Sequence, residues 1–278
     1  MQDKKRGLNA RQKVILTLTV SIGLIFIAII FSFILTNENL TTNFAKKSLP
    51  PSWSHLFGTD WLGRDMLTRT LKGLRLSLFV GFLGASIGAV IATILGICAA
   101  TLGKKADYII SWLVDMFIGI PHLVFIILIS FAVGGGIKGV VCGVAFTHWP
   151  SLTRIIRAEV LSIKNSEYIQ MAKNFGKTKW FIVRKHIMPH IIPQIMVGFL
   201  LLFPHAILHE ASITFLGFGL SVQTPSIGLI LSEAVKHISV GDWWLAVFPG
   251  LLLVLVVKSF DNIGEQVRTL VEPATANE

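Results

Sequence analysis

Two histidines and a glutamate in one apolar stretch are the residues best suited to chemistry. His205 and His209 lie one helical turn apart, and Glu210 follows directly. Side chains four positions apart share one face of an α-helix, so both imidazoles could bind the same transition-metal ion. The HExxH pattern of zinc proteases is absent, because no carboxylate lies between the two histidines. Two interpretations stay open, a metal or transport site and two histidines that hydrogen-bond to neighbouring helices, and no metal is firmly assigned.

Further polar residues interrupt apolar stretches beside prolines. Asp115 precedes Pro121-His122 by about one and a half turns, and His148-Trp149-Pro150 closes another stretch. A carboxylate at the centre of a membrane helix costs roughly 2.5–3.5 kcal/mol, so Asp115 is expected to face protein or water, either in an ion pair or along a path. Trp149 is expected at the membrane interface. The candidate residues of a translocation pathway are therefore Asp115, His122, His148, His205, His209 and Glu210.

Gly176-Lys177-Thr178 has the ending of a nucleotide-binding P-loop. That motif requires an earlier glycine, where Met171 stands, and a strand before the loop, where this chain predicts a helix. No nucleotide is therefore expected to bind here. The sequence also contains no Ser/His/Asp order, paired-carboxylate motif or dinucleotide fingerprint in a plausible place. We expect no catalytic residue and no cofactor bound by this chain.

The composition is typical of an integral membrane protein. Of 278 residues, 53% are hydrophobic and 14% are charged, and the mean hydropathy is +0.70, which ordinary soluble domains do not show. The net charge of +10 is spread over loops beside apolar stretches. A nucleic-acid reader would gather such charge on a soluble face, whereas basic loops suit an anionic lipid surface. We therefore expect the lipid bilayer, and no nucleic acid, as a partner.

Six apolar segments are expected to form an all-α, multi-pass membrane fold. The first is expected to be a retained transmembrane helix, because no small-residue cleavage site follows it. The third is broken by Pro121, and residues 215–240 are expected to form a glycine-rich re-entry. The second carries a ladder of small residues that lets another helix come close, and this ladder consists of Gly84, Gly88, Ala92, Gly96 and Ala100. The expected spans are residues 14–35, 76–102, 108–133, 137–152, 190–214 and 243–260.

The segments between the spans indicate the orientation. Residues 36–75 are expected to lie outside the cell, with an amphipathic helix from Met66 to Leu74 along the membrane interface. Lys and Arg concentrate in residues 1–13, 103–107 and 154–189, which places these regions in the cytoplasm, although the basic residues of 36–75 oppose this assignment. Both termini, including a tail of residues 265–278, are then cytoplasmic.

Residues 154–189, the basic segment, are expected to contain two short helices joined by a glycine turn. Ser166 can cap the first helix and Gly176 can end it, while Thr178 can cap a second helix that Pro189 stops. An amphipathic pair on the wet side of a membrane either lies on the lipid surface or binds a soluble partner, and we favour the partner. The first helix carries one apolar stripe, formed by Tyr168, Met171, Ala172 and Phe175.

Three stretches resemble the permease subunits of binding-protein-dependent ABC importers, specifically the peptide/nickel branch. They are residues 58–65, residues 167–189, and the group formed by 211–219, 225–228 and 248–250. The second stretch is similar to the cytoplasmic EAA loop of these permeases. It departs from the pattern at Gln170 and Met171, which stand where the pattern has glutamate and alanine.

The resemblance implies a type I ABC importer transmembrane domain over residues 76–264, with residues 154–189 as its coupling loop. It implies that this non-catalytic subunit works with a second homologous permease subunit, an external solute-binding protein and two cytoplasmic ATPase subunits that use ATP and Mg. The location implied is the bacterial cell membrane. The residues implied in coupling to the ATPase are Glu167, Tyr168, Gln170, Met171, Ala172, Phe175, Gly176 and Pro189.

The cargo has two candidates. His148, His205 and His209 resemble positions of the nickel-import subunits more than of the dipeptide ones, and imidazole suits nickel. We therefore expect nickel or a nickel chelate, with di- or oligopeptides as the alternative. Functions of another class are a self-sufficient channel or secondary transporter and a membrane metal enzyme that uses His205, His209 and Glu210. An inverted repeat, which would favour a secondary transporter, is not evident.

Overall fold

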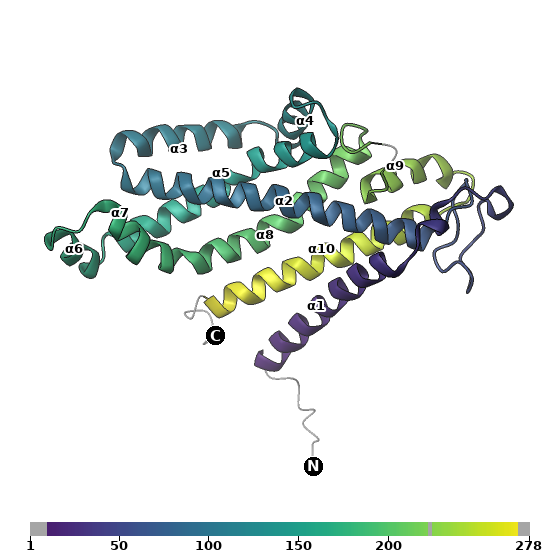
Figure 1. Ribbon diagram of the computed structural model, residues 1–278, viewed down its shortest axis with the longest axis horizontal. Helices are drawn as coiled ribbons and strands as arrows, with labels where there is room; N and C mark the ends of the chain where they lie inside the picture. The colour runs from purple at the N-terminus through teal and green to yellow at the C-terminus, as the bar shows by residue number, and fades with distance from the viewer. Residues whose placement is uncertain (1–9, 222–223, 272–278) are drawn as a thin grey trace, which may run out of the picture.

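All regular secondary structure in the computed structural model, which describes residues 10–221 and 224–271, is helical (Figure 1). Within these residues the β-pairing is limited to an isolated bridge between Thr59 and Asp65. The predicted all-α fold class is confirmed. The helices are α1 (Ala10–Ile34), α2 (Met66–Thr101), α3 (Lys104–Gly119), α4 (His122–Ala132), α5 (Gly136–Lys164), α6 (Glu167–Asn174), α7 (Lys179–Ile182), α8 (Met188–Phe215), α9 (Ile227–Ile238) and α10 (Trp244–Val271), with short 3₁₀ helices at Asn37–Leu40 and Phe44–Lys46 and a π-helical turn at Val183–Ile187.

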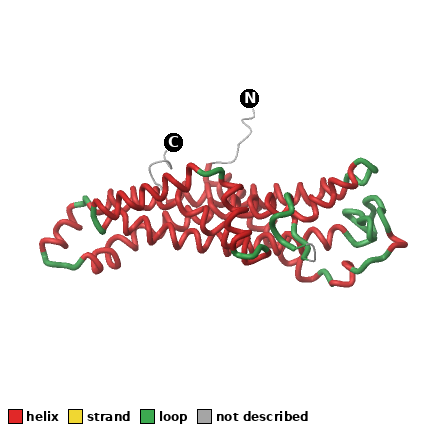
Figure 2. Tube along the Cα trace, turned by 90° about the horizontal axis from the view of Figure 1, so that it is seen from above, coloured by secondary structure: helices red, strands yellow, loops and turns green. Residues whose placement is uncertain are grey.

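The molecule is elongated, and α2, α3 and α5 run along its length (Figures 1 and 2). The α6 and α7 helices lie at one end, and the segment between α1 and α2 lies at the other, beside α9 (Figure 1). The α1 and α10 helices pack against each other. Of the predicted terminal regions, residues 1–9 and 272–278 lie outside the described residues. Residues 265–271 of the predicted tail are helical and form the last turns of α10.

Four helical segments of the described chain are long and apolar enough to cross a membrane, and the bent pair of α3 and α4 makes a fifth. They are residues 14–34, α2, residues 179–215 and α10. The remaining predicted span, residues 137–152, corresponds to α5, which has 29 residues. Polar side chains are distributed along α5, and it packs against α2, α4 and α8. A helix enclosed by other helices needs less apolar surface than one that faces lipid.

The small-residue ladder of α2 packs against α5, as predicted. A Cβ atom at Gly84 would lie 2.6 Å from Val144 Cγ1, and one at Gly96 would lie 2.8 Å from Ile156 Cγ2. Both distances are shorter than any normal carbon–carbon contact, so only glycine permits this helix separation. The contact aligns α5 along the full bundle and fixes where His148 lies.

The sequence predicts that this span ends at residue 152. In the structure, α5 includes Pro150 and continues to Lys164. Proline at this position removes the N–H group that would bond the carbonyl of Phe146. The indole Nε1 of Trp149 donates to that carbonyl instead, at 2.9 Å. The predicted interfacial role of Trp149 is therefore wrong, since its side chain is buried in the bundle and satisfies the backbone that Pro150 leaves open.

The amphipathic interface helix predicted before residue 76 is also wrong, because Met66 begins α2 and the helix is continuous to Thr101. Asp65 caps it by accepting the Thr68 N–H at 2.9 Å. Met66 and Leu74 are fully buried, Met66 against residues of α9 and α10. The apolar stripe that suggested a membrane interface is covered by protein.

A buried ion-pair network holds residues 48–65 against the end of the bundle that contains α9. Asp60 is fully buried and accepts from Arg64 Nε at 2.6 Å and from Arg69 Nη1 at 3.1 Å. Arg69 also pairs with Glu233 of α9. The network orders a segment that has almost no regular secondary structure of its own.

The predicted break at Pro121 is confirmed, since α3 and α4 meet at an angle of 101°. Pro121 precedes the first residue of α4, His122. The α4 helix folds back on α5, where a Cβ atom at Gly139 or Gly143 would lie within 3 Å of a carbonyl oxygen of α4. This close packing brings His122 above the middle of α5.

Candidate functional site

The α6 helix and the turn after it are defined by local sequence. Gly176 has a φ of +73°, and two hydrogen bonds close the turn, from Gly176 N–H to Lys173 O at 2.9 Å and from Lys177 N–H to Ala172 O at 3.1 Å. This is the Schellman motif, which favours glycine at the residue of positive φ. The predicted glycine end is confirmed. Ser166 occupies the predicted cap position, but its hydroxyl donates to Ile163 O instead.

One apolar residue fixes α6 to the bundle, and the predicted stripe is left open. Ile169 is fully buried and packs with Ile182 and Ile187. In contrast, the exposed fractions are 41% for Tyr168, 57% for Met171 and 75% for Phe175. Ala172 is half-buried beside the core, while Glu167 and Gln170 are exposed. The anchoring role of Ile169 was not predicted. Its spacing of three residues from Ala172, which is half-buried on the same helix, is the sequence signal that could have indicated it.

The second helix of the basic segment does not stop at Pro189. Thr178 caps α7, accepting the Phe181 N–H at 3.3 Å as predicted. A π-helical turn then joins α7 to α8, with the Met188 N–H bonded to Val183 O. Pro189 lies in the first turn of α8, where a missing N–H is tolerated. Residues 179–215 therefore form one continuous helical segment from the tip of the molecule into the bundle.

Four of the six candidate pathway residues line one cavity. It has a volume of about 630 Å³ and lies between the α3–α4 break, α5 and α8. The lining includes Thr147, Phe117 and Leu202, which the sequence did not single out, and it contains no charged side chain. We call this space the histidine cavity, after the imidazoles that line it, those of His122, His148, His205 and His209.

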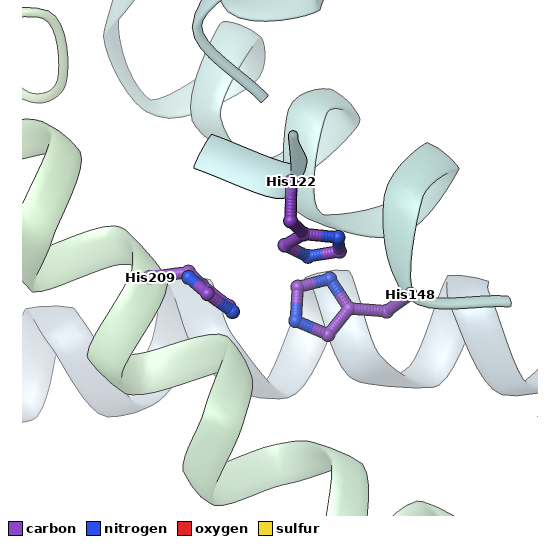
Figure 3. A group of neighbouring side chains, drawn as sticks. All are labelled: His122, His148 and His209. Carbon is purple, nitrogen blue, oxygen red and sulfur yellow. The ribbon is translucent and has the colours of Figure 1, made fainter. Parts of the chain in front are cut away.

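Three of these imidazoles converge on one point (Figure 3). The ring centroids of His122 and His209 are 4.6 Å apart, those of His122 and His148 are 4.7 Å apart, and those of His148 and His209 are 5.1 Å apart. Each ring offers a nitrogen within 4.8 Å of a nitrogen of the other two. His205 lies one turn before His209 and is exposed.

The structure does not bring the two candidate carboxylates into the cavity. Asp115 pairs with Arg154, and both side chains are more than half exposed. Glu210 is fully buried and accepts a hydrogen bond from Thr214 at 3.0 Å. Neither of them is among the residues that line the cavity. Of the two alternatives for Asp115, the ion pair is the one observed.

Comparisons with known proteins agree with this architecture. The family described as "Binding-protein-dependent transport system inner membrane component" matches residues 88–270, which is more than half of the chain. The chain belongs to this family. Its members are permease subunits of ABC importers, so the protein is a transport subunit that works with ATPase and solute-binding partners, and not an enzyme.

Several relatives cover nearly the whole chain. The dipeptide transport system permease protein DppC of Bacillus subtilis is 33% identical over 98% of this chain and 85% of its own length. The oligopeptide transport system permease protein OppC of the same organism is 30% identical over 92% of this chain and 84% of its own length. The probable D,D-dipeptide permease protein DdpC of Escherichia coli is 30% identical over 92% of this chain and 86% of its own length.

A solved structure has the same fold. An inward-facing form of the MetNI methionine ABC transporter aligns with a TM-score of 0.62 and 20% sequence identity, over 74% of this chain and 97% of the matched chain. This binding-protein-dependent permease is thus an integral membrane protein with the fold of an ABC importer subunit.

Proposed function

We propose that this permease forms half of a translocation pathway and that α6 and α7 receive a cytoplasmic ATPase. The observation that carries the proposal is the exposed apolar surface formed by Tyr168, Met171, Phe175 and Trp180, the last 72% exposed. The α6 and α7 helices, which carry these side chains, lie at one end of the molecule (Figure 1). An exposed apolar patch outside a membrane marks a protein interface, and an amphipathic helix fits a groove on its partner.

The continuous helical segment from α7 into α8 gives this docking a mechanical consequence. Two ATPase subunits that close on ATP and Mg would move two coupling helices, one on this chain and one on a second homologous permease subunit. Because residues 179–215 form one helical segment, displacement at α7 is transmitted to the part of α8 that carries His205 and His209. An external solute-binding protein delivers the cargo at the opposite end.

The orientation follows from the same surface. The α6 and α7 helices and the basic segment face the cytoplasm, and residues 36–65 face the outside of a bacterial cell. The α1 helix begins and α10 ends on the side away from residues 36–65 (Figure 1). Both termini are then cytoplasmic, in agreement with the concentration of lysine and arginine in the basic segment.

The proposed cargo is nickel or a nickel chelate. Its support is the histidine cavity, where imidazoles, the side chains that suit nickel, line one space between three parts of the bundle. Short peptides are the second candidate, because the relatives are named for transport of dipeptides and oligopeptides. Family membership favours an ATP-driven importer over a self-sufficient channel.

The test is uptake by vesicles that contain the complete importer, with its external binding protein and ATP on the ATPase side. We expect ATP-dependent uptake of radioactive nickel and no competition from a dipeptide mixture. Uptake of labelled peptide without nickel uptake would replace the first cargo by the second. Flux through the purified chain alone, driven by an ion gradient, would contradict the importer mechanism.

A further inference from the structure

We infer that His122, His148 and His209 form a coordination site for a divalent transition-metal ion, either free or held by a small anionic chelator. The role of this site in transport rests on the proposed function. Its ability to bind metal does not. The inference is carried by three independent features, which are the convergence of the rings, the hydrogen bonding of His148 and the absence of charge in the cavity lining.

The three imidazoles come from separate elements of the bundle. His122 begins α4 after the Pro121 break, His148 lies in the middle of α5, and His209 lies in α8. Their ligand nitrogens lie within 4.8 Å of one another. A metal–nitrogen bond of about 2.0–2.1 Å places the ligand atoms roughly 3.0–3.4 Å apart, so small side-chain movements would close the site. Binding would tie three helices together at one point.

Hydrogen bonding prepares His148 as a ligand. Its Nδ1 lies 2.8 Å from Val144 O, and because a carbonyl can only accept, Nδ1 carries the proton. The lone pair of the neutral ring is then on Nε2, which is the arrangement of metal-binding histidines whose other nitrogen donates to a backbone carbonyl. His148 is 95% buried, yet its Nε2 has no hydrogen-bond partner in the described part of the chain.

His122 has a similarly unused nitrogen. Its Nε2 is buried and also lacks a hydrogen-bond partner among the described residues. Burying a polar atom without a hydrogen-bond partner is unfavourable, and two such atoms in one cavity are a feature that a ligand would explain. Both rings face His209 across the cavity (Figure 3). A cation at this point would satisfy both nitrogens at once.

The lining of the cavity indicates the kind of metal complex. No carboxylate contributes to it, so neutral imidazoles alone would surround a doubly charged ion. Such a site suits borderline metals such as nickel and zinc, and disfavours magnesium and calcium, which prefer oxygen ligands. Uncompensated charge is costly in a poorly solvated place. A chelator with carboxylates would neutralise the ion, and a volume of about 630 Å³ leaves room for a small one.

The experiment measures metal binding directly on the full-length chain, purified without a polyhistidine tag and placed in lipid nanodiscs. Titration calorimetry uses three probes, which are Ni²⁺ alone, Ni²⁺ with iminodiacetate, which leaves three coordination positions open, and Ni²⁺ with EDTA, which leaves none. We expect one metal per chain for at least one of the first two probes, and these two arms distinguish a free ion from a chelate. We expect no binding of the EDTA complex.

The ligand set is tested by substitution. His148→Asn keeps a donor near the Nδ1 position but removes Nε2, and His209→Asn removes a ligand that is only partly buried. Since loss of an outer-shell partner alone costs about 10–100-fold in metal affinity, each variant should bind at least about tenfold more weakly. X-ray absorption should count three imidazoles in the parent chain and two in each variant. The His205→Asn variant should keep three imidazoles on the metal.

His190→Asn is the matched control, because His190 is an exposed histidine outside the cavity. It should leave affinity and imidazole count unchanged. The inference is overturned if neither open probe binds, if the EDTA complex binds equally well, or if the His148 and His209 variants retain full affinity. Metal binding that these variants abolish supports the site even if vesicles show no nickel uptake, a result that would instead refute the proposed cargo.

Discussion

The α6–α7 pair and the histidine cavity differ in the way the sequence builds them. The α6–α7 pair is local, because its caps, its glycine turn and its exposed stripe all lie between residues 166 and 182. The cavity is assembled from residues of three stretches that lie far apart in the sequence, 117–122, 147–151 and 202–209. The pair presents apolar side chains outward, whereas the cavity collects polar side chains inward. A transport subunit thus combines a surface that periodicity reveals with a site that only helix packing creates.

The largest effect on transport should come from negative charge on the apolar stripe of α6, and this effect distinguishes the α6–α7 pair from the cavity. In Met171→Asp/Phe175→Asp we expect loss of ATPase co-purification and of transport of every cargo, because apolar anchors of an interface contribute at least about 2 kcal/mol each. Both side chains are exposed, so the bundle should stay folded. Pull-down of the ATPase measures docking. The control is Lys173→Asp, which makes the same change of two charge units on the other face of α6, where Lys173 is exposed. Retained docking in the double variant would show that the stripe is not the interface.

Within the bundle, a single methyl group should be costly where the ladder of α2 meets α5. Gly84→Ala should lower the free energy of unfolding by about 1–3 kcal/mol, the usual range for overpacking, because its Cβ would lie 2.6 Å from Val144 Cγ1. Denaturant titration in detergent measures this. Gly23→Ala, where no atom lies within 4 Å of the added Cβ, should not destabilise the protein. Equal effects in the two variants would contradict the packing described.

Substitution of Gly176 should destabilise the protein through backbone strain and not through a steric clash. Nothing lies within 4 Å of an added Cβ atom, but the φ of Gly176 is +73°. Gly176→Ala should strain the turn by about 1–2 kcal/mol, and Gly176→Asn should strain it less, because asparagine adopts this conformation more readily. Faster hydrogen exchange at the amides of Gly176 and Lys177 would report the opened turn. A more strongly strained asparagine variant would argue against the backbone explanation.

The smallest expected effects are in the ion pairs between α3 and α5. Arg157 Nη2 donates to Asp107 Oδ2 at 2.6 Å, and both side chains are about one-third exposed. A double-mutant cycle should give a coupling energy of about 0.2–1 kcal/mol for this pair. The cycle for Asp115 and Arg154, which are more than half exposed, should give less. A larger value for the second pair would return Asp115 to the set of functional candidates.

The helical fold, the break at Pro121, the packing ladder and the Thr178 cap of α7 could be predicted because each depends on neighbouring residues or on helix period. Three helix boundaries, at Met66, residue 152 and Pro189, could not be predicted from local sequence. Pro150 is compatible with a helix because Trp149 satisfies the freed carbonyl, and Pro189 is compatible because a π-helical turn precedes it. The helix at Met66 is covered by α9 and α10, which no local pattern indicates.

The candidate site was predicted in part for the same reason. His205 and His209 could be paired from their spacing, but the convergence of His122 and His148 with His209 depends on the α3–α4 bend and on α5 continuing through Pro150. Glu210 is adjacent to His209 in sequence, yet it lies outside the cavity lining, because successive helical residues point in different directions.

The most direct test of the docking account is photo-crosslinking in vesicles that contain the assembled importer. A photoreactive residue is placed at Phe175, on the α6 stripe, and in a second variant at Trp53, which is 98% exposed at the opposite end of the molecule. We expect position 175 to crosslink to the cytoplasmic ATPase and position 53 not to. A crosslink to the ATPase from position 53, or none from position 175, would contradict the docking account.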